Sequence, residues 1–457
     1  MRIHPHVGVE LMSALQKHGI CWYDLRIWEK NITFVADITT NEMKPIRHIL
    51  LALVMLTGVA VYGQRHEIYN DRIASLQVVA GVDWLSPPVI TLNGPEVINI
   101  GFDDLTHEYH RYTYKVEHCE ADWSVSTELF DTEYLEGFFE GNVIEDTEES
   151  LNTNQLYTHY RFQIPNSHCR LKMGGNYRVT VIDENEDEEM FSACFMVVEP
   201  MMGVSLEVST ITDIDVNNRY QQVSMDVSYD SGINIIYPER QLKTVLMQNG
   251  RWDNARINVP PSYRMEHGFH WSHCRDFIFD GGNEYHKFEI LDNDHPTLGI
   301  DFIRWDGEMY HAYPFEDVPR PNYLYDEDAN GAFYIRNSDN YENDRLSDYD
   351  WVHFRKPSER YLGEMYVNGV WTNDRFTDQY RLEYNDSTQS YEGAVLLKQG
   401  YYSCQYLLLD ENGITHNVEN EGNYYQTENT YQALVYFRET GGRTDRLVGY
   451  QQVQFGR

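Results

Sequence analysis

Short stretches in which apolar and polar residues alternate recur along most of this chain. Clear examples are Tyr112–Val116, Tyr177–Val181, Val223–Val227 and Tyr401–Leu409. A period of two residues, with β-branched and aromatic side chains enriched, is typical of strands that are buried on one face. No long segment carries the period of an amphipathic helix. The pattern therefore predicts an all-β protein.

Tight-turn dipeptides separate many of these stretches. They are Asn93-Gly94, Asn249-Gly250, Asp306-Gly307, Asn368-Gly369 and Asn412-Gly413. Asn-Gly and Asp-Gly readily take the positive φ angles that close hairpins require. Many short strands with turns between them favour tandem immunoglobulin-like β-sandwich domains.

An export signal is expected inside the chain, beginning at Met43. Lys44 and Arg47 form a cationic head, and the run 49–60 is apolar and uncharged. Such a run is shorter than the roughly 20 residues that a membrane-spanning helix needs, so it is interpreted as a signal peptide. Small residues near Gly63 predict cleavage before Gln64. No cysteine stands at that site, so a covalent lipid is not expected.

The rest of the chain is expected to divide into three domains. Residues 1–42 are interpreted as an upstream extension from a misassigned start codon, with a longer signal n-region as the alternative. Residues 43–63 form the signal peptide. The mature chain is then predicted to hold an N-terminal β-sandwich over 64–200, a middle β domain over 201–318 and a C-terminal β-sandwich over 319–457. Glu199-Pro200 and the Tyr313–Tyr325 stretch mark the two boundaries.

The mature chain is strongly acidic. The full sequence has 36 basic and 72 acidic residues, and residues 1–63 hold six and five of them, which leaves 30 against 67 and a net charge of −37. Such a charge repels phosphate backbones and anionic membrane surfaces, so nucleic acid is not expected as a partner. It favours a soluble protein, which we expect to be a monomer.

Five cysteines remain after processing: Cys119, Cys169, Cys194, Cys274 and Cys404. An odd number leaves at least one free thiol, and the sequence does not say which of the others pair. His118 beside Cys119 suggests a thiol protease, but neighbouring residues on a strand point to opposite faces and cannot form a catalytic pair. A structural role is favoured for both.

Two segments could hold a metal, and a structural interpretation is preferred for each. Asp183–Glu189 is rich in carboxylates, yet it lies between two strand patterns and lacks the spacing of an EF-hand loop, so a solvated hairpin tip is expected. His267, His270, His273 and Cys274 are suitable zinc ligands, but Gly268 makes a helix there doubtful. No metal or other cofactor is predicted. No G-x-S-x-G, H-E-x-x-H or P-loop motif occurs, so an enzyme is not expected.

Tyrosine is unusually abundant, with 35 residues in the full chain. Sheets enrich tyrosine, but tyrosine also suits binding surfaces because it offers wide contact area at low entropic cost. Those set among Asp and Asn in residues 323–350 are expected to contact a partner: Tyr323, Tyr325, Tyr334 and Tyr341.

Several longer segments, in order along the mature chain, resemble the plug proteins of the bacterial type IX secretion system. They are Gly101–Leu105, Tyr112–Trp123, Glu133–Gly137, Asn152–Pro165, Gly174–Tyr177, Phe279–Ile290, Asp348–Phe354, Leu397–Tyr406 and Tyr424–Leu447. The positions singled out within these segments serve either the fold or an interface. They are Asp103, Asp104, His118, Cys119, Asp122, Trp123, Tyr157, His159, Tyr160, Gly281, Gly282, Asn283, Asp348, Tyr349, Gly400 and Tyr401.

The resemblance implies a periplasmic, non-catalytic protein that closes the periplasmic mouth of a very large outer-membrane translocon barrel until a substrate-loaded partner replaces it. The barrel protein is then the expected partner. Two alternatives remain open. One is a carbohydrate-binding module, because Glu364–Trp371 resembles the strand and turn of glycogen-binding sandwiches. The other is a periplasmic hydrolase that uses carboxylates or Cys119.

Overall fold

The structure is a computed structural model that describes residues 66–456. The expected extension over 1–42 and signal peptide over 43–63 lie outside these residues. Strands make up nearly all of the regular structure, and the helices are short pieces of three or four residues. The prediction of an all-β fold is confirmed. Between residues 66 and 456, every helix falls short of the length and hydropathy needed to cross a bilayer.

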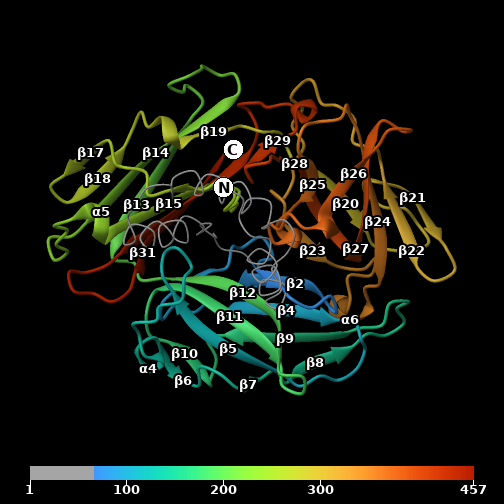
Figure 1. Ribbon diagram of the computed structural model, residues 1–457, viewed down its shortest axis with the longest axis horizontal. Helices are drawn as coiled ribbons and strands as arrows, with labels where there is room; N and C mark the ends of the chain where they lie inside the picture. The colour runs from blue at the N-terminus through green and yellow to red at the C-terminus, as the bar shows by residue number, and fades with distance from the viewer. Residues whose placement is uncertain (1–65, 457) are drawn as a thin grey trace, which may run out of the picture. The chain divides into compact units, whose positions relative to one another are not determined.

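The first core is a sandwich of two sheets, drawn in blue to green in Figure 1. One sheet has the order β1-β12-β11-β5-β7, with β3 beside β12, and the other has the order β2-β4-β9-β8. The elements are β1 Glu67–Ile68, β2 Ile73–Ala80, β3 Val89–Thr91, β4 Ile98–Asp104, β5 Tyr112–Cys119, α4 Asp131–Tyr134, β6 Leu135–Gly137, β7 Asn142–Val143, β8 Asp146–Glu149, β9 Thr158–Ile164, β10 Cys169–Leu171, β11 Gly175–Asp183 and β12 Glu188–Val198.

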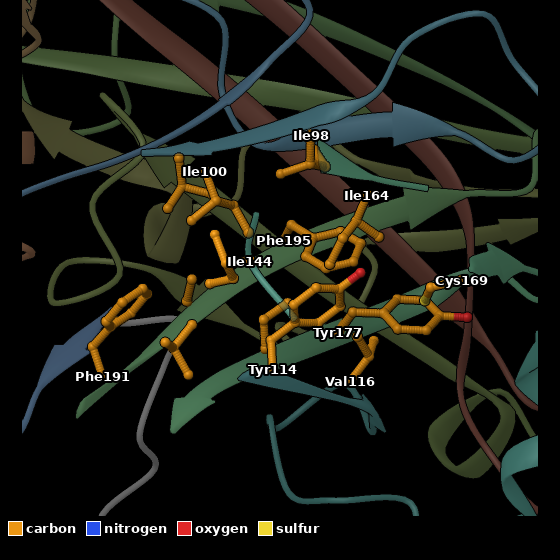
Figure 2. Packing of buried hydrophobic residues seen from close by; sticks show 14 of the residues in the cluster. Ile98, Ile100, Tyr114, Val116, Ile144, Ile164, Cys169, Tyr177, Phe191 and Phe195 are labelled. Carbon is orange, nitrogen blue, oxygen red and sulfur yellow. The ribbon is translucent and has the colours of Figure 1, made fainter. Parts of the chain in front are cut away.

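Inward-facing side chains from both sheets fill this first core. Ile98 and Ile100 of β4 face Tyr177 of β11 and Phe195 of β12, and all four are fully or almost fully buried (Figure 2). Each large aromatic side chain buried in this way contributes roughly 1.5–3 kcal/mol. β11 and β12 pair antiparallel, and the acidic run forms the tip between them, as the sequence predicts.

The second core combines residues far apart in the sequence. A sheet of order β13-β14-β18-β17, with β19 beside β14, packs on a sheet of order β16-β15-β30-β31. The elements are β13 Met202–Ser209, β14 Tyr220–Tyr229, α5 Pro238–Gln241, β15 Leu242–Gln248, β16 Arg256–Ile257, β17 Tyr263–Met265, β18 Gly268–Trp271, η2 Arg275–Phe277, β19 Ile278–Asp280, β30 Asn429–Phe437 and β31 Arg446–Phe455.

The last two strands therefore do not belong to a third contiguous domain over 319–457. β30 pairs with β15 along seven residues, and the red C-terminal strands lie among the yellow-green ones in Figure 1. Both faces of β30 are buried: Ala433 and Val435 enter the second core, whereas Leu434 and Tyr436 pack against Met196 of the first. A strand buried on both faces loses its polar alternation, so its sequence does not reveal its partner.

The third core is formed by a ten-stranded sheet of order β20-β28-β25-β26-β27-β24-β22-β21, with β23 and β29 also paired to β28. The elements are β20 His286–Ile290, β21 Ile300–Trp305, β22 Tyr310–Pro314, β23 Phe333–Ile335, α6 Asn343–Leu346, β24 Tyr349–Pro357, β25 Glu364–Asn368, η3 Val370–Thr372, η4 Asp378–Tyr380, β26 Arg381–Asn385, β27 Ser390–Lys398, β28 Gly400–Leu409, β29 Thr415–Asn417 and η5 Glu419–Glu421.

Not every expected turn is a hairpin turn. Asn249 and Gly250 both take positive φ after β15, and Gly307 and Gly413 do so between β21 and β22 and between β28 and β29. Gly369 instead has an extended φ of −170° and leads into η3. A Cβ at this position would lie 2.7 Å from the carbonyl oxygen of Ser403, so close packing explains this glycine.

Candidate functional site: polar junctions between the cores

The first and third cores meet at a buried cluster of polar side chains. Asp103 at the end of β4 accepts hydrogen bonds from Lys398 Nζ at 2.6 Å and from the Tyr349 hydroxyl at 2.7 Å. His159 Nδ1 lies 2.7 Å from the other carboxylate oxygen. Burial opposes ionisation of Asp103, but Lys398 and His159 outweigh it and lower the pKa of its carboxyl. The cluster therefore contains an ionised carboxylate that depends on a neighbouring core for its cation.

Two further contacts strengthen this junction. Asp348 accepts hydrogen bonds from the backbone N–H groups of Asn154 and Gln155 and from the Asn154 side chain. The hydroxyl of Tyr157 donates to the Ser347 carbonyl at 2.7 Å, and Lys398 Nζ lies 4.0 Å from the centre of the Tyr157 ring. A cation desolvated against an aromatic face gains about 2 kcal/mol.

The first and second cores meet along an apolar layer with a polar edge. Trp123 packs edge-on against Trp252, with ring centres 5.8 Å apart, and Cys119 lies in the same buried layer. At the edge, Arg438 bridges Glu120 at 2.6 Å and Asp445 at 2.9 Å. The Arg438 guanidinium thus links Glu120, which follows β5, to Asp445 in the hairpin between β30 and β31.

His118 and Cys119 point to opposite faces of β5, as predicted. His118 contacts the Tyr177 ring and lies 2.9 Å from the Ser126 hydroxyl, which in turn contacts Thr444. Burial lowers the pKa of His118 to about 4 and raises that of the Cys119 thiol to about 12. A neutral imidazole and a protonated thiol on different faces cannot act as base and nucleophile.

The glycine-rich segment after β19 connects the second and third cores. A Cβ on Gly281 would lie 2.1 Å from the Tyr424 carbonyl oxygen, and Gly282 has a positive φ of 67°. Asn283 donates to the Glu421 carbonyl at 2.7 Å. A close backbone approach therefore explains Gly281, and the positive φ explains Gly282.

The remaining family positions are also internal or local. Asp104 accepts a hydrogen bond from Tyr112 at 2.6 Å, and the hydroxyl of Tyr160 donates to the His110 carbonyl. Asp122 accepts from the backbone N–H of Ser124 in a turn. A Cβ on Gly400 would lie 2.4 Å from the Tyr334 carbonyl oxygen, and the ring of Tyr401 packs against Trp84. Asp104, Tyr160 and Asp122 thus serve the first core or a local turn, whereas Tyr401 meets Trp84 across a junction.

The four candidate partner-contact tyrosines fall into two groups. Tyr341 is 63% exposed and Tyr325 is 48% exposed. Tyr323 instead donates to Glu284 at 2.6 Å, and Tyr334 packs against Trp84 with ring centres 5.5 Å apart. Tyr341 and Tyr325 are therefore exposed enough to meet a partner, whereas Tyr323 and Tyr334 are more buried.

Sequence reasoning missed a second buried ionic cluster, inside the third core. Glu421 bonds to Lys356 and Arg320, and its carboxylate lies 2.8 Å from His286 Nε2. Asp317 lies 2.7 Å from His286 Nδ1. This cluster ties residues 315–332 to the sheet, so the expected linker is part of the third core. The sequence did contain a sign that Lys356 is buried. On β24 it occupies the next alternate position after Val352 and Phe354, which both point inward.

The two segments that could have held a metal contain ion pairs with residues elsewhere in the chain. His270 pairs with Asp226 and His273 with Asp213. Asp183 is fully buried and pairs with Arg72 at 2.5 Å. Across residues 66–456, no group of three or more His, Cys, Asp and Glu side chains is arranged to hold a metal. The five cysteines in this range are free thiols.

Residues 73–199 match the family model described as "Type 9 secretion system plug protein 1st domain". No curated protein matches the chain. A solved structure of a hypothetical protein from Parabacteroides merdae is 38% identical, covers 86% of this chain and 100% of its own, and superimposes with a TM-score of 0.83. The C-terminal domain of the Streptococcus pyogenes protein AspA, 9% identical over 86% of this chain and 99% of its own, has a TM-score of only 0.15 and carries no argument. The 38% identical structure shares the fold over 86% of this chain. On the family match over residues 73–199, the chain belongs to the plug protein family of the type IX secretion system.

Proposed function

We propose that this protein is a non-enzymatic periplasmic plug. It occludes the periplasmic opening of the large outer-membrane translocon barrel of the type IX secretion system until a substrate-loaded partner replaces it. Membership of the plug family carries the proposal, and it gives the protein a role in type IX secretion. Export by the signal peptide over 43–63 is part of the same proposal.

Buried polar contacts between the three cores support this role, because they oppose movement of one core against another. A plug resists deformation only if its parts cannot slide, and the three cores are joined by buried polar contacts as well as apolar layers. Asp103 and Lys398 are 0% and 1% exposed, and Asn176 accepts a hydrogen bond from Tyr436 in a fully buried position. Separating the cores would expose unpaired charges, which costs several kcal/mol for each ion.

The surface offers a means of reversible binding. Tyr325 and Tyr341 are exposed on the long segment between β22 and β24 and would serve as aromatic anchors. An interface of roughly 1,200–2,000 Å² with a few such anchors gives specific binding without requiring permanent association. The net charge of −37 would then favour a barrel rim that is basic and make association sensitive to salt.

Crosslinked pull-down of the tagged mature protein from solubilised outer membranes tests the proposal. Recovery of one very large outer-membrane barrel protein is expected, with crosslinks from residues 323–350. Replacing both Tyr325 and Tyr341 with Ala should reduce recovery several-fold, because truncation of one central aromatic anchor costs about 2 kcal/mol or more. Tyr109→Ala is the matched control, since Tyr109 is equally exposed, at 66%, on the first core. Recovery of only glycans or unrelated periplasmic proteins would contradict the proposal.

A further inference from the structure

A cleft of about 430 Å³ opens where segments from all three cores meet. The first core contributes Trp84, the second Arg251 and Trp252, and the third Asp328 and Asn373. Ligand sites form preferentially at such junctions, where a concave surface combines aromatic walls with a few polar groups. None of the family positions discussed above lines this cleft, although Tyr285 of the family segment Phe279–Ile290 does.

Two amide oxygens in the cleft lack hydrogen-bond donors. Oδ1 of Asn330 and Oδ1 of Asn373 are both buried and unpartnered, and both residues line the cleft. Asn373 is only 9% exposed. A buried carbonyl oxygen without a donor costs about 1–3 kcal/mol, which a ligand with N–H groups would recover.

The charged groups of the cleft favour a cation. Asp328 lines it, whereas the charge of Arg251 is matched by Asp253 at 2.5 Å and also interacts with Asp374. Asp328 accepts hydrogen bonds from the backbone N–H groups of Tyr285 and Asn330, which orient its carboxylate but do not neutralise it. The residues that line the cleft therefore include the Asp328 carboxylate and two buried amide oxygens without donors.

We propose that this cleft binds the guanidinium group of an arginine side chain presented by a polypeptide. A guanidinium is planar and carries five N–H donors in a fixed fork, so it can serve Asn330, Asn373 and Asp328 at once. Its flat face can stack on an indole, and Trp84 is half-buried in the wall of the cleft. An ammonium has only three donors and no flat face.

The environment of Asp328 agrees with this ligand. Burial raises the pKa of Asp328 to about 7, although the two backbone N–H donors lower it. Repulsion from Glu284 raises it further. Lys287 opposes it weakly, because its ammonium group is bonded to Asp326 and to the Glu327 carbonyl. A guanidinium in the cleft supplies the missing positive charge.

Isothermal titration of the mature protein with Nα-acetyl-L-argininamide tests the inference, with the citrulline analogue as the uncharged ligand of the same shape. Binding with a Kd on the order of 1 mM is expected for arginine and none for citrulline. Asn373→Gly should weaken binding about tenfold, because a hydrogen bond to a charged group is lost. Glycine tolerates the positive φ of 54° at this position, so the backbone is retained.

Two controls keep the experiment decisive. Asn152→Gly makes the same change at an exposed residue with a φ of 60°, and its affinity should equal that of the wild type. Asp328→Asn keeps the shape of the side chain and should abolish detectable binding. Equal binding of arginine and citrulline, tighter binding of a lysine analogue or of a neutral sugar, or wild-type affinity in Asn373→Gly and Asp328→Asn would each overturn the inference. These outcomes are independent of whether the protein closes a translocon.

Discussion

Lys398 at the end of β27 donates a hydrogen bond of 2.6 Å to Asp103 at the end of β4, and neither side chain is exposed by more than 1%. The two residues are 295 positions apart and belong to different hydrophobic cores. Their pairing makes the stability of the first core depend on the third.

Lys398→Met should destabilise the protein by about 3–5 kcal/mol, because it leaves Asp103 buried without its cation. Urea unfolding followed by tryptophan fluorescence measures the change. The double variant Asp103→Leu with Lys398→Met should be more stable than Lys398→Met alone. Lys287→Met, which breaks a pair with the largely exposed Asp326, is the control and should cost about 1 kcal/mol or less. Equal effects of the two lysine substitutions would refute the special role of the buried pair.

His286 should make stability depend on pH. Burial lowers its pKa, but Asp317 and Glu421 outweigh burial and raise it from 6.5 to about 9. Because the folded value is the higher one, the stabilisation is complete below pH 6.5 and is lost as the pH rises toward 9. His286→Gln should therefore lower the free energy of unfolding by about 1–3 kcal/mol more near pH 6.5 than above pH 9. Urea unfolding at both pH values measures the difference. An equal cost at both would show that His286 is neutral in the folded protein.

Thiol reactivity should separate Cys274 from the other four cysteines of the described chain. Burial raises the pKa of Cys169 to about 11 and that of Cys119 to about 12, whereas Cys274 is only half-buried. Iodoacetamide at neutral pH should label Cys274 first, and all five thiols should react after unfolding in urea. Mass spectrometry of the digested protein identifies the labelled sites. Fast labelling of native Cys119, or a disulfide in the unreduced digest, would contradict the structure.

Trp371 should stabilise the fold and take no part in binding sugars. The side chain is 7% exposed, donates to the Ser403 carbonyl at 3.0 Å and packs beside Phe354 and Tyr402. Trp371→Ala should cost about 3–5 kcal/mol. The neighbouring Val370 is 49% exposed, and Val370→Ala should change stability by less than about 1 kcal/mol. A glycan array on which wild-type protein binds and folded Trp371→Ala does not would revive the carbohydrate-binding alternative.

The sequence predicts local structure better than long-range pairing in this protein. Alternation identified β5, β11, β14 and β28, because part of each strand alternates apolar with polar residues. Alternation did not predict that β30 pairs with β15, because the sequence of a strand buried on both faces does not indicate which strand lies beside it. The same limit applies to function: Tyr349 lies among aspartates and looks exposed in sequence, yet its hydroxyl donates to Asp103 inside the junction. Long-range hydrogen bonds such as this one are visible only once distant strands are placed.

Whether the protein closes a pore can be measured directly as the conductance of the purified translocon barrel in a planar lipid bilayer. Added to the periplasmic side, the mature protein should reduce the large open conductance to near zero, and high salt should restore it because an acidic plug binds a basic rim partly by charge. Tyr109→Ala should block as well as wild type, whereas the double Tyr325 and Tyr341 variant should need several-fold more protein. An open conductance that stays unchanged at saturating mature protein would contradict the proposed function.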